Sequence, residues 1–262
     1  MKVSGTVRVA ILGGAGRMGQ CIARLAAQNS AIQVVARVDV RTDADGISPA
    51  IIPNLAGAPE FDVLVDFSSP AATAAALPEV RRRKCAWLVA TTALPDSLRA
   101  DILALGSICP VMIAANTSIG IAIMQRLAAQ AATALRDWDC EILETHHHGK
   151  KDAPSGTAFA LANTVADVMR GQGRNPKIVT DRSALHDPRD PDSIGIASLR
   201  GGTVAGEHTV TWFGSDERLE IRHVADDRVI FAHGALKIAR WLASKPEGVY
   251  DMNALLKDIV HG

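Results

Sequence analysis

Short apolar runs alternate with longer segments rich in alanine, leucine and arginine through the first 117 residues of the chain. The runs favour strands, and the longer segments carry apolar residues at helical spacing. The expected strands are Val7–Leu12, Gln33–Asp39, Val63–Asp66, Trp87–Thr91 and Val111–Ala114. The expected helices are Gly16–Gln28, Ala71–Arg83 and Ser97–Leu105. Strands that are apolar along their whole length need cover on both faces, so the pattern predicts an α/β fold with a Rossmann-like, doubly wound parallel sheet.

The pattern changes after Asn116 and predicts a second, α+β domain with a mixed sheet. The expected helices of this second part are Ile119–Leu135, Ser155–Met169 with Ser155 as N-cap, and Phe231–Leu242. The expected strands are Trp138–Thr145, Ile194–Leu199, Glu207–Phe213 and Arg218–Val224, the last two joined by a turn near Gly214–Asp216. Because Gly171–Ser193 is rich in Gly, Pro, Asp and Arg, we expect a long loop there.

We therefore expect two domains. Residues 1–117 form the first, to which residues 233–262 return, and residues 118–232 form the second.

The overall charge excludes two classes of partner. Lys plus Arg equals Asp plus Glu at 28 each, so no net charge draws the chain to nucleic acid or to a membrane surface. No stretch approaches the roughly 18 apolar residues that would span a bilayer. Cysteines are scattered without a CxxC pair, which indicates thiols in a reducing compartment, and we expect a cytoplasmic protein. The cysteines are Cys21, Cys85, Cys109 and Cys140.

A glycine loop follows the first expected strand and opens the first expected helix. It runs from Gly13 to Gly19 and satisfies GxGxxG from Gly14. Glycines let the backbone turn tightly and approach a pyrophosphate, whose charge lies at the helix N-terminus. Alone, the triplet could be a tight structural turn. The strand–turn–helix context and Asp39, which ends the second strand 20 residues after Gly19, favour a dinucleotide site instead.

Asp39 also bears on which dinucleotide binds. A carboxylate there can bind the adenosine ribose hydroxyls and disfavours a 2′-phosphate. Arg17, Arg37 and Arg41 are near enough in sequence to accept such a phosphate. The cofactor expected is NADH and/or NADPH, with NADH favoured.

The densest group of chemically active residues lies in the segment from Glu141 to Ala158. A histidine that titrates near neutrality supplies a movable proton, and Lys150 adds a positive charge. With Ser155 as N-cap, the first N–H groups of the helix can hold a carboxylate. The segment thus suits a small anion that needs protonation. A solvated polar loop and a metal site are the alternatives. Adjacent histidines on an extended strand point to opposite faces and chelate poorly, so no metal is expected.

This segment resembles the signature of the 4-hydroxy-tetrahydrodipicolinate reductase (dihydrodipicolinate reductase) family of lysine and diaminopimelate biosynthesis. The resemblance lies in Glu144–Ala158, which reads E-x-H-H-x-x-K-x-D-x-P-S-G-T-A. Further matches in the family order are Gly-Arg-Met-Gly at 16–19, Asp-Val-Leu-Val-Asp-Phe-Ser at 62–68, Thr91-Thr92, Ala114-Ala115-Asn116, Gly-Glu-His-Thr at 206–209 and Arg-Leu-Glu-Ile-Arg-His at 218–223.

The resemblance implies a role for each matching position. His146 resembles the proton donor and acceptor, Lys150 the second catalytic group, and His147 a ligand of one substrate carboxylate. Gly156 and Thr157 resemble the backbone cradle of the other carboxylate. The nucleotide-binding positions implied are Gly13, Gly14, Ala15, Gly16, Arg17, Met18 and Asp39, and those of two loops flanking the nicotinamide are Ala90, Thr91, Thr92, Ala114, Ala115, Asn116 and Thr117.

The same resemblance implies an NAD(P)H-dependent reductase of a small cyclic dicarboxylate. It also implies a dinucleotide-binding first domain, and a second domain that binds substrate and assembles a homotetramer. Departures from the family pattern include Val40, where an arginine is common, and this weakens the case for NADPH. Two alternatives stay open, namely another Rossmann oxidoreductase acting on an amino-acid-like substrate and a non-catalytic module that senses NADH. Neither accounts for the residues from His146 to Thr157.

Overall fold

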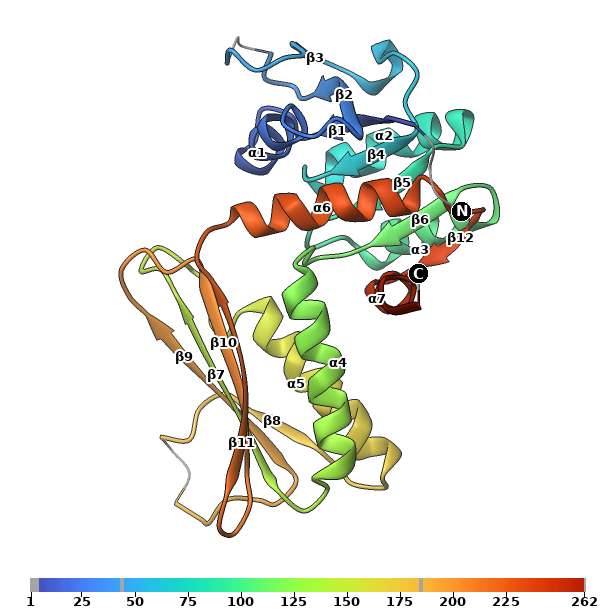
Figure 1. Cartoon of the computed structure of the whole chain (residues 1–262). Coiled ribbons are helices and arrows are strands. Elements are labelled where there is room, and N and C mark those ends of the chain that lie inside the picture. Colours follow the sequence, from blue (N-terminus) through green and yellow to red (C-terminus); the bar gives the residue numbers. More distant parts are fainter. Residues whose placement is uncertain (1–4, 43–44, 184–185, 262) are drawn as a thin grey trace. The chain divides into compact units, whose positions relative to one another are not determined.

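The computed structural model describes residues 5–42, 45–183 and 186–261 and divides the chain into two compact units. The first consists of residues 1–118 and 229–262, and the second of residues 119–228. Figure 1 labels the elements of both units. Within the described residues, no helix combines the length and apolar character needed to cross a membrane.

The first unit is a seven-stranded parallel sheet in the order β12-β6-β5-β4-β1-β2-β3. Its strands are β1 (Val7–Leu12), β2 (Ile32–Val38), β3 (Ile51–Ile52), β4 (Val63–Asp66), β5 (Ala86–Val89), β6 (Pro110–Ile113) and β12 (Gly248–Tyr250). Strands β4 and β5 are buried at every position because helices cover both faces, which confirms the predicted doubly wound sheet. The chain order reverses between β1 and β4, the position where ligands bind in open sheets of this kind.

Helices α1 (Arg17–Ala26) and α6 (Val229–Leu242) contact each other, and α6 packs on β4, β5 and β6. Helices α2 (Pro70–Arg83) and α3 (Asp96–Ala104) contact each other as well, and pack on β5 and β6 respectively. The short 3-10 turns η1 (Leu55–Gly57) and η2 (Leu105–Ser107) and the helix α7 (Met252–His261) complete the unit. α2 begins sharply because Ser69 accepts a hydrogen bond from the backbone N–H of Ala72 and proline occupies the first turn.

The second unit is a five-stranded mixed sheet in the order β11-β10-β7-β9-β8, as the α+β pattern predicted. Its strands are β7 (Asp139–His146), β8 (Lys177–Val179), β9 (Ser193–Arg200), β10 (Gly206–Phe213) and β11 (Arg218–Ala225). Helices α4 (Ile119–Ala134) and α5 (Gly156–Gly171) contact each other and pack on one face of this sheet. A separate apolar core around Trp212 fills the space between the helices and the sheet.

The prediction of an unstructured loop over Gly171–Ser193 is wrong in part. Strand β8 lies inside this segment and pairs in parallel with β9, and β9 begins at Ser193. Three residues are too few to show a period, so the pattern gave no signal. Residues 184–185 of the segment lie outside the described residues. Arg189 fastens the segment to β7, because its guanidinium donates to Asp139 at 2.6 Å and to Glu141 at 3.0 Å.

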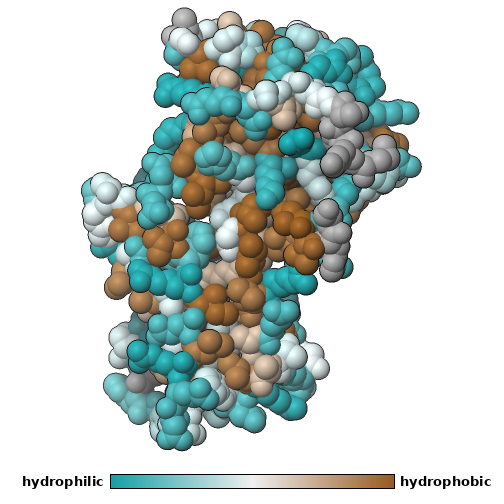
Figure 2. All heavy atoms as spheres, viewed as in Figure 1, coloured by the Kyte–Doolittle hydropathy of each residue, from teal (hydrophilic) through white to brown (hydrophobic). Residues whose placement is uncertain are grey.

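The surface of the second unit has two apolar areas. On α4, Ile123 and Leu127 point outward, and Figure 2 shows apolar side chains over this helix. On the sheet, the register places Leu143, Leu199, Phe213 and Val224 on the face opposite the buried side of β7, and all four are exposed.

Candidate active site

The glycine loop between β1 and α1 is shaped by close backbone contacts. Gly13 has φ +85°, and a Cβ there would collide with the carbonyl of Phe67. A Cβ at Gly19 would collide with the carbonyl of Gly13, so only glycine lets α1 begin this close to the turn. The N–H groups of Gly13 and Gly14 donate to the carbonyl of Val38, at 2.9 and 3.0 Å. The loop is therefore held against the end of β2, as a dinucleotide site requires.

A cavity of about 690 Å³ opens beside this loop. Among the predicted residues, Gly13, Gly16 and Asp39 line it, with further walls from residues 53–55 and 67–76. The Asp39 carboxylate accepts hydrogen bonds from the backbone N–H groups of Ala15 and Arg41, both at 3.1 Å. Those contacts fix the carboxylate at the rim of the cavity, where ribose hydroxyls could reach it. The glycines that a Cβ would obstruct, the carboxylate and the cavity together fit a bound dinucleotide.

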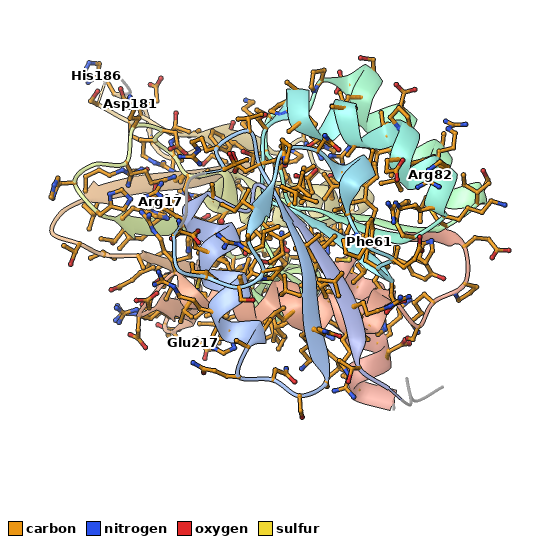
Figure 3. The ribbon with its side chains drawn as sticks, turned by 90° about the horizontal axis from the view of Figure 1, so that it is seen from above. Arg17, Phe61, Arg82, Asp181, His186 and Glu217 are labelled. Atoms are coloured by element: carbon orange, nitrogen blue, oxygen red, sulfur yellow. The ribbon has the colours of Figure 1, made fainter. Side chains whose placement is uncertain are left out.

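The arginines near Asp39 divide into two kinds. Arg17 is exposed at the start of α1 (Figure 3), and Arg41 is exposed beside the cavity. Arg37 is fully buried, and its guanidinium pairs with Asp45 and donates to the carbonyls of Gly14 and Ile47, both at 2.8 Å. Arg37 is thus committed to structure, and the interpretation that it could accept a phosphate is wrong.

The two loops predicted to flank the nicotinamide follow β5 and β6, at the same sheet edge as the glycine loop. Thr91 is buried, and its hydroxyl donates to Asp66 at 2.8 Å. Thr117 is also buried, and its hydroxyl donates to the carbonyl of Phe231 at 2.7 Å. Both threonine side chains therefore fasten loops rather than face a ligand, whereas Thr92 and Ala115 are exposed.

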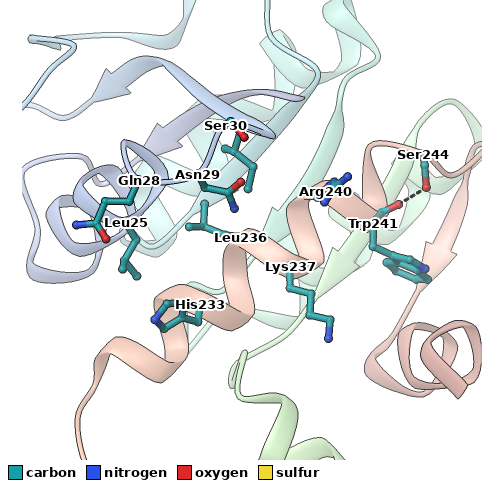
Figure 4. A pocket seen from close by; sticks show the side chains of 11 residues that line it. Leu25, Gln28, Asn29, Ser30, His233, Leu236, Lys237, Arg240, Trp241 and Ser244 are labelled. Atoms are coloured by element: carbon teal, nitrogen blue, oxygen red, sulfur yellow. Dashed lines mark hydrogen bonds between the residues drawn. The ribbon is translucent and has the colours of Figure 1, made fainter. Parts of the chain in front are cut away.

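A second hollow of the first unit, of about 670 Å³, lies between α1 and α6 (Figure 4). None of the residues predicted from the sequence lines it. His233 and Lys237 are on its α6 side, and their side chains end well apart from each other in Figure 4. These side chains do not converge on one point, so the hollow offers no grouped site for a ligand.

The second unit contains the histidine–lysine segment, at the end of β7 and the start of α5. Ser155 caps α5, because its hydroxyl accepts from the backbone N–H of Ala158 at 3.1 Å, as predicted. Gly156 opens the helix at an exposed position, where a Cβ would meet nothing within 4 Å. The helix N-terminus thus has room beside it for an anion.

His146 is the buried member of the histidine triplet. Its Nδ1 lies 2.5 Å from the Glu144 carboxylate, and its ring meets the ring of His208 edge to face at 5.2 Å. Period-two alternation places Glu144 and His146 on the same face of β7, which is the covered face.

His147 and Lys150 lie at the more open side. The Nε2 of His147 accepts from the guanidinium of Arg228 at 2.7 Å. Desolvation and the positive charge of Arg228 lower the pKa of His147, so the ring is neutral and able to accept this bond at pH 7. Lys150 pairs with Asp152 at 2.9 Å. One segment therefore contains a histidine that can carry a proton and a lysine that carries a fixed positive charge. An anion that accepts a proton needs both kinds of group.

Three residues of this cluster were missed by sequence reasoning. Arg200 donates to both oxygens of Glu144, at 2.7 and 2.9 Å. His208 reaches the Ser155 hydroxyl at 3.2 Å, and Arg228 contacts His147. All three lie more than 50 residues from their partners along the chain, so no local pattern could reveal these contacts. His208 does belong to the Gly-Glu-His-Thr match at 206–209, but that match assigned it no role. Within the described residues, no three His, Cys, Asp or Glu side chains are grouped to hold a metal ion.

Comparison with known proteins gives matches along nearly the whole chain. The family model for dihydrodipicolinate reductase, N-terminus, matches residues 7–117, and the model for dihydrodipicolinate reductase, C-terminus, matches residues 120–256. A 4-hydroxy-tetrahydrodipicolinate reductase of Zymomonas mobilis is 40% identical over 259 residues, covering 98% of this chain and 99% of the relative. One from Xanthomonas campestris is 38% identical over 254 residues, covering 95% and 98%.

Solved structures agree with these matches. The dipicolinate-bound dihydrodipicolinate reductase from Paenisporosarcina sp. gives a TM-score of 0.76 at 25% identity and covers 95% of this chain and 99% of that chain. A myo-inositol dehydrogenase from Corynebacterium glutamicum, with a TM-score of 0.57 at 15% identity over 93% of this chain and 90% of that chain, shares the fold alone.

The burial of His208 has a consequence for stability. Desolvation lowers the pKa of His208 to about 4, whereas an unfolded histidine titrates near 6.5. As the pH falls below 6.5, His208 binds a proton in the unfolded chain but stays neutral in the native chain. The free energy of unfolding therefore decreases between pH 6.5 and 4. We expect this residue to reduce the free energy of unfolding by about 2 kcal/mol between pH 7 and pH 5.

Urea denaturation of the wild type and of His208→Gln at both pH values tests this. The wild type should lose more stability than the variant by that amount. An equal loss in both proteins would show that His208 is not a buried neutral imidazole.

Proposed function

The chain belongs to the dihydrodipicolinate reductase family, and on this premise we propose that it is an NAD(P)H-dependent reductase that converts 4-hydroxy-tetrahydrodipicolinate into tetrahydrodipicolinate. This reaction is a step of lysine and diaminopimelate biosynthesis. The observation that carries the proposal is the grouping of a buried imidazole, a lysine, an arginine and a helix N-terminus in the second unit. These groups suit a doubly negative ring that must be protonated, because the cations and the helix N-terminus attract carboxylates and the imidazole carries a proton.

Each group has a distinct task. When bound, the nicotinamide supplies hydride. His146 protonates the ring carbon next to the one reduced, and Lys150 stabilises the negative charge that develops or assists the loss of water. His147 binds one carboxylate, and the backbone at Gly156 and Thr157 binds the other. Arg228 orients His147 and adds positive charge.

The assignment of the dinucleotide to the first unit rests on the glycine loop, the cavity beside it and Asp39. A reducing cytoplasm suits the four cysteines, which form no disulfide. The alternative of another Rossmann oxidoreductase does not explain the matches in the second half of the chain, and an NADH-sensing module would need no acid–base cluster.

We further propose that NADH is preferred to NADPH. Asp39 holds a negative charge where the adenosine ribose would lie, and it repels a 2′-phosphate. Val40 is 90% exposed and offers no charge, and Arg37 is engaged within the fold. Arg17 and Arg41 remain as the cations able to offset this repulsion.

A homotetramer is proposed from the exposed sheet face of the second unit. Leu143, Leu199, Phe213 and Val224 form an apolar surface that water would otherwise contact. Cyclic and dihedral assemblies cover such surfaces with copies of themselves.

Removal of the acid should stop turnover with little effect on binding of the nucleotide. A positioned general acid contributes about 10²–10⁴ in rate, so we expect His146→Gln to lower kcat at least about 100-fold. Steady-state kinetics with 4-hydroxy-tetrahydrodipicolinate, with NADH binding followed by fluorescence, tests this. A His146→Gln enzyme within a few-fold of wild-type kcat would remove His146 from the acid role.

Lys150→Ala should lower kcat and raise KM for the dicarboxylate.

The charge of Asp39 should set the choice of cofactor. Asp39→Asn removes the charge and keeps one acceptor oxygen, so it can retain the hydrogen bond from the N–H group of either Ala15 or Arg41, which bond different oxygens of Asp39. We expect the ratio of kcat/KM for NADH to that for NADPH to fall by about 10-fold, the effect of about 1.4 kcal/mol. Asp62→Asn, which alters a carboxylate paired with Arg8, is the control and should leave the ratio unchanged. An unchanged ratio in Asp39→Asn would place discrimination elsewhere.

A charge on the sheet face should disrupt assembly. Leu199 is 53% exposed, and Leu199→Asp would put a carboxylate into an apolar interface, where burial of a charge is costly. Light scattering coupled to gel filtration should report a tetramer for the wild type and a smaller species for this variant. Val249→Asp is the matched control, because Val249 is 56% exposed on the first unit. A tetramer that survives Leu199→Asp would exclude this face as the interface.

A further inference from the structure

Glu144 is a buried carboxylate with no assigned role. Its side chain has no solvent exposure, and it lies two residues before His146 on the covered face of β7. The backbone N–H of Ser155 and the guanidinium of Arg200 both donate to it, and Nδ1 of His146 lies 2.5 Å from it. Both carboxylate oxygens are thus occupied by donors of the protein.

These donors keep Glu144 ionised. Burial raises its pKa, but the hydrogen bonds, led by those of Arg200, outweigh burial and bring the pKa to about 2. An ionised carboxylate can only accept hydrogen bonds. The nitrogen of His146 that faces it must therefore carry a proton, which makes Nδ1 the donor.

The other ring nitrogen, Nε2, lies on the opposite side, next to Gly206. A Cβ at Gly206 would lie 3.0 Å from Nε2 and 3.3 Å from Cδ2, so glycine leaves space along the Nε2 edge of the ring. The neighbouring ring of His208 directs its own Nε2 to the Ser155 hydroxyl, at 3.2 Å. Nδ1 of His208 is buried and has no hydrogen-bond partner, so neither nitrogen of His208 is bonded to Nε2 of His146.

We propose that Glu144 is a positioning residue for His146, and that it fixes the proton on Nδ1 so that Nε2 is the nitrogen that exchanges a proton with substrate. In the proton transfer, the Nε2–H bond of the imidazolium breaks and a C–H bond forms on the substrate carbon. The ring is left neutral with its Nδ1 proton in place, and solvent restores the Nε2 proton. Glu144 stays ionised throughout and stabilises the imidazolium. This inference rests on the proposed function, since it assumes His146 as the acid.

A purely structural role for Glu144 is the competing explanation, because the carboxylate also neutralises the buried end of Arg200. Arg200 has two further acceptors, the carbonyls of Leu199 at 2.6 Å and Asp152 at 2.8 Å. Removal of the charge therefore leaves the guanidinium with partners. A structural role would alter stability, but it would not act on catalysis through His146.

The test uses Glu144→Gln, with Glu141→Gln as the matched control. Glu141 lies on the same strand with its side chain toward the other face, paired with Arg182 and Arg189. We expect Glu144→Gln to lower kcat about 100-fold, with NADH binding unchanged, and Glu141→Gln to keep wild-type kcat. In the double variant Glu144→Gln/His146→Gln, kcat should equal that of His146→Gln, because groups that act as a unit are not additive. A folded Glu144→Gln enzyme with kcat within a few-fold of wild type, or additive losses in the double variant, would overturn the proposal.

Nitrogen NMR of the wild-type protein shows which ring nitrogen of His146 carries the proton, even if Glu144→Gln does not fold. The neutral ring of His146, assigned by its loss in His146→Gln, should show the Nδ1–H tautomer. An Nε2–H tautomer would reject the role of Glu144. The proposed function would fail in a different measurement, if the wild type did not reduce 4-hydroxy-tetrahydrodipicolinate. The tautomer of His146 could still be measured in that case.

Discussion

The ion pair between Glu144 and Arg200 holds the candidate substrate site together. It joins β7 to β9, and through the backbone N–H of Ser155 and the carbonyl of Asp152 it also holds the chain that leads into α5. A buried charge left without its partner costs about 3–5 kcal/mol, so the pair constrains everything attached to it. His146 and the cap residue Ser155 bond directly to this carboxylate, and Arg200 holds the carbonyl of Asp152, which follows Lys150 in the chain.

The first unit depends on a simpler constraint. In a parallel sheet the carboxyl ends of the strands meet at one edge, so the glycine loop, Asp39 and the loops after β5 and β6 gather there. Asp66 supports this edge from below, because it accepts from the hydroxyls of Thr73 and Thr91 at 2.7 and 2.8 Å. Backbone geometry places the predicted nucleotide-binding residues, whereas a network of side-chain hydrogen bonds places the predicted substrate-binding residues.

This difference explains what the sequence could predict. The glycine loop with Asp39 and the segment from His146 to Thr157 are local patterns, and the elements around them follow the apolar periodicity closely. Strands β8 and β12 are too short to show a period, and β3 has only two residues. Arg200 and Arg228 meet Glu144 and His147 only after β9 and β11 have been placed, and the buried hydroxyl of Thr117 is explained by Phe231, 114 residues later. Contacts of this kind depend on tertiary structure, and no single segment encodes them.

Arg37 links the conformation of the glycine loop to that of the segment after β2. Its guanidinium holds the carbonyl of Gly14 in the glycine loop and, on its other side, Asp45 and the carbonyl of Ile47 in the segment after β2. The segment after β2, which lines the cavity at Val40 and Arg41, is thereby tied to the glycine turn. An insertion or deletion between residues 40 and 50 would displace that turn through the hydrogen bonds of the buried Arg37. Natural variation in cofactor choice in this lineage should therefore proceed by exchange of side chains such as Val40 at constant loop length.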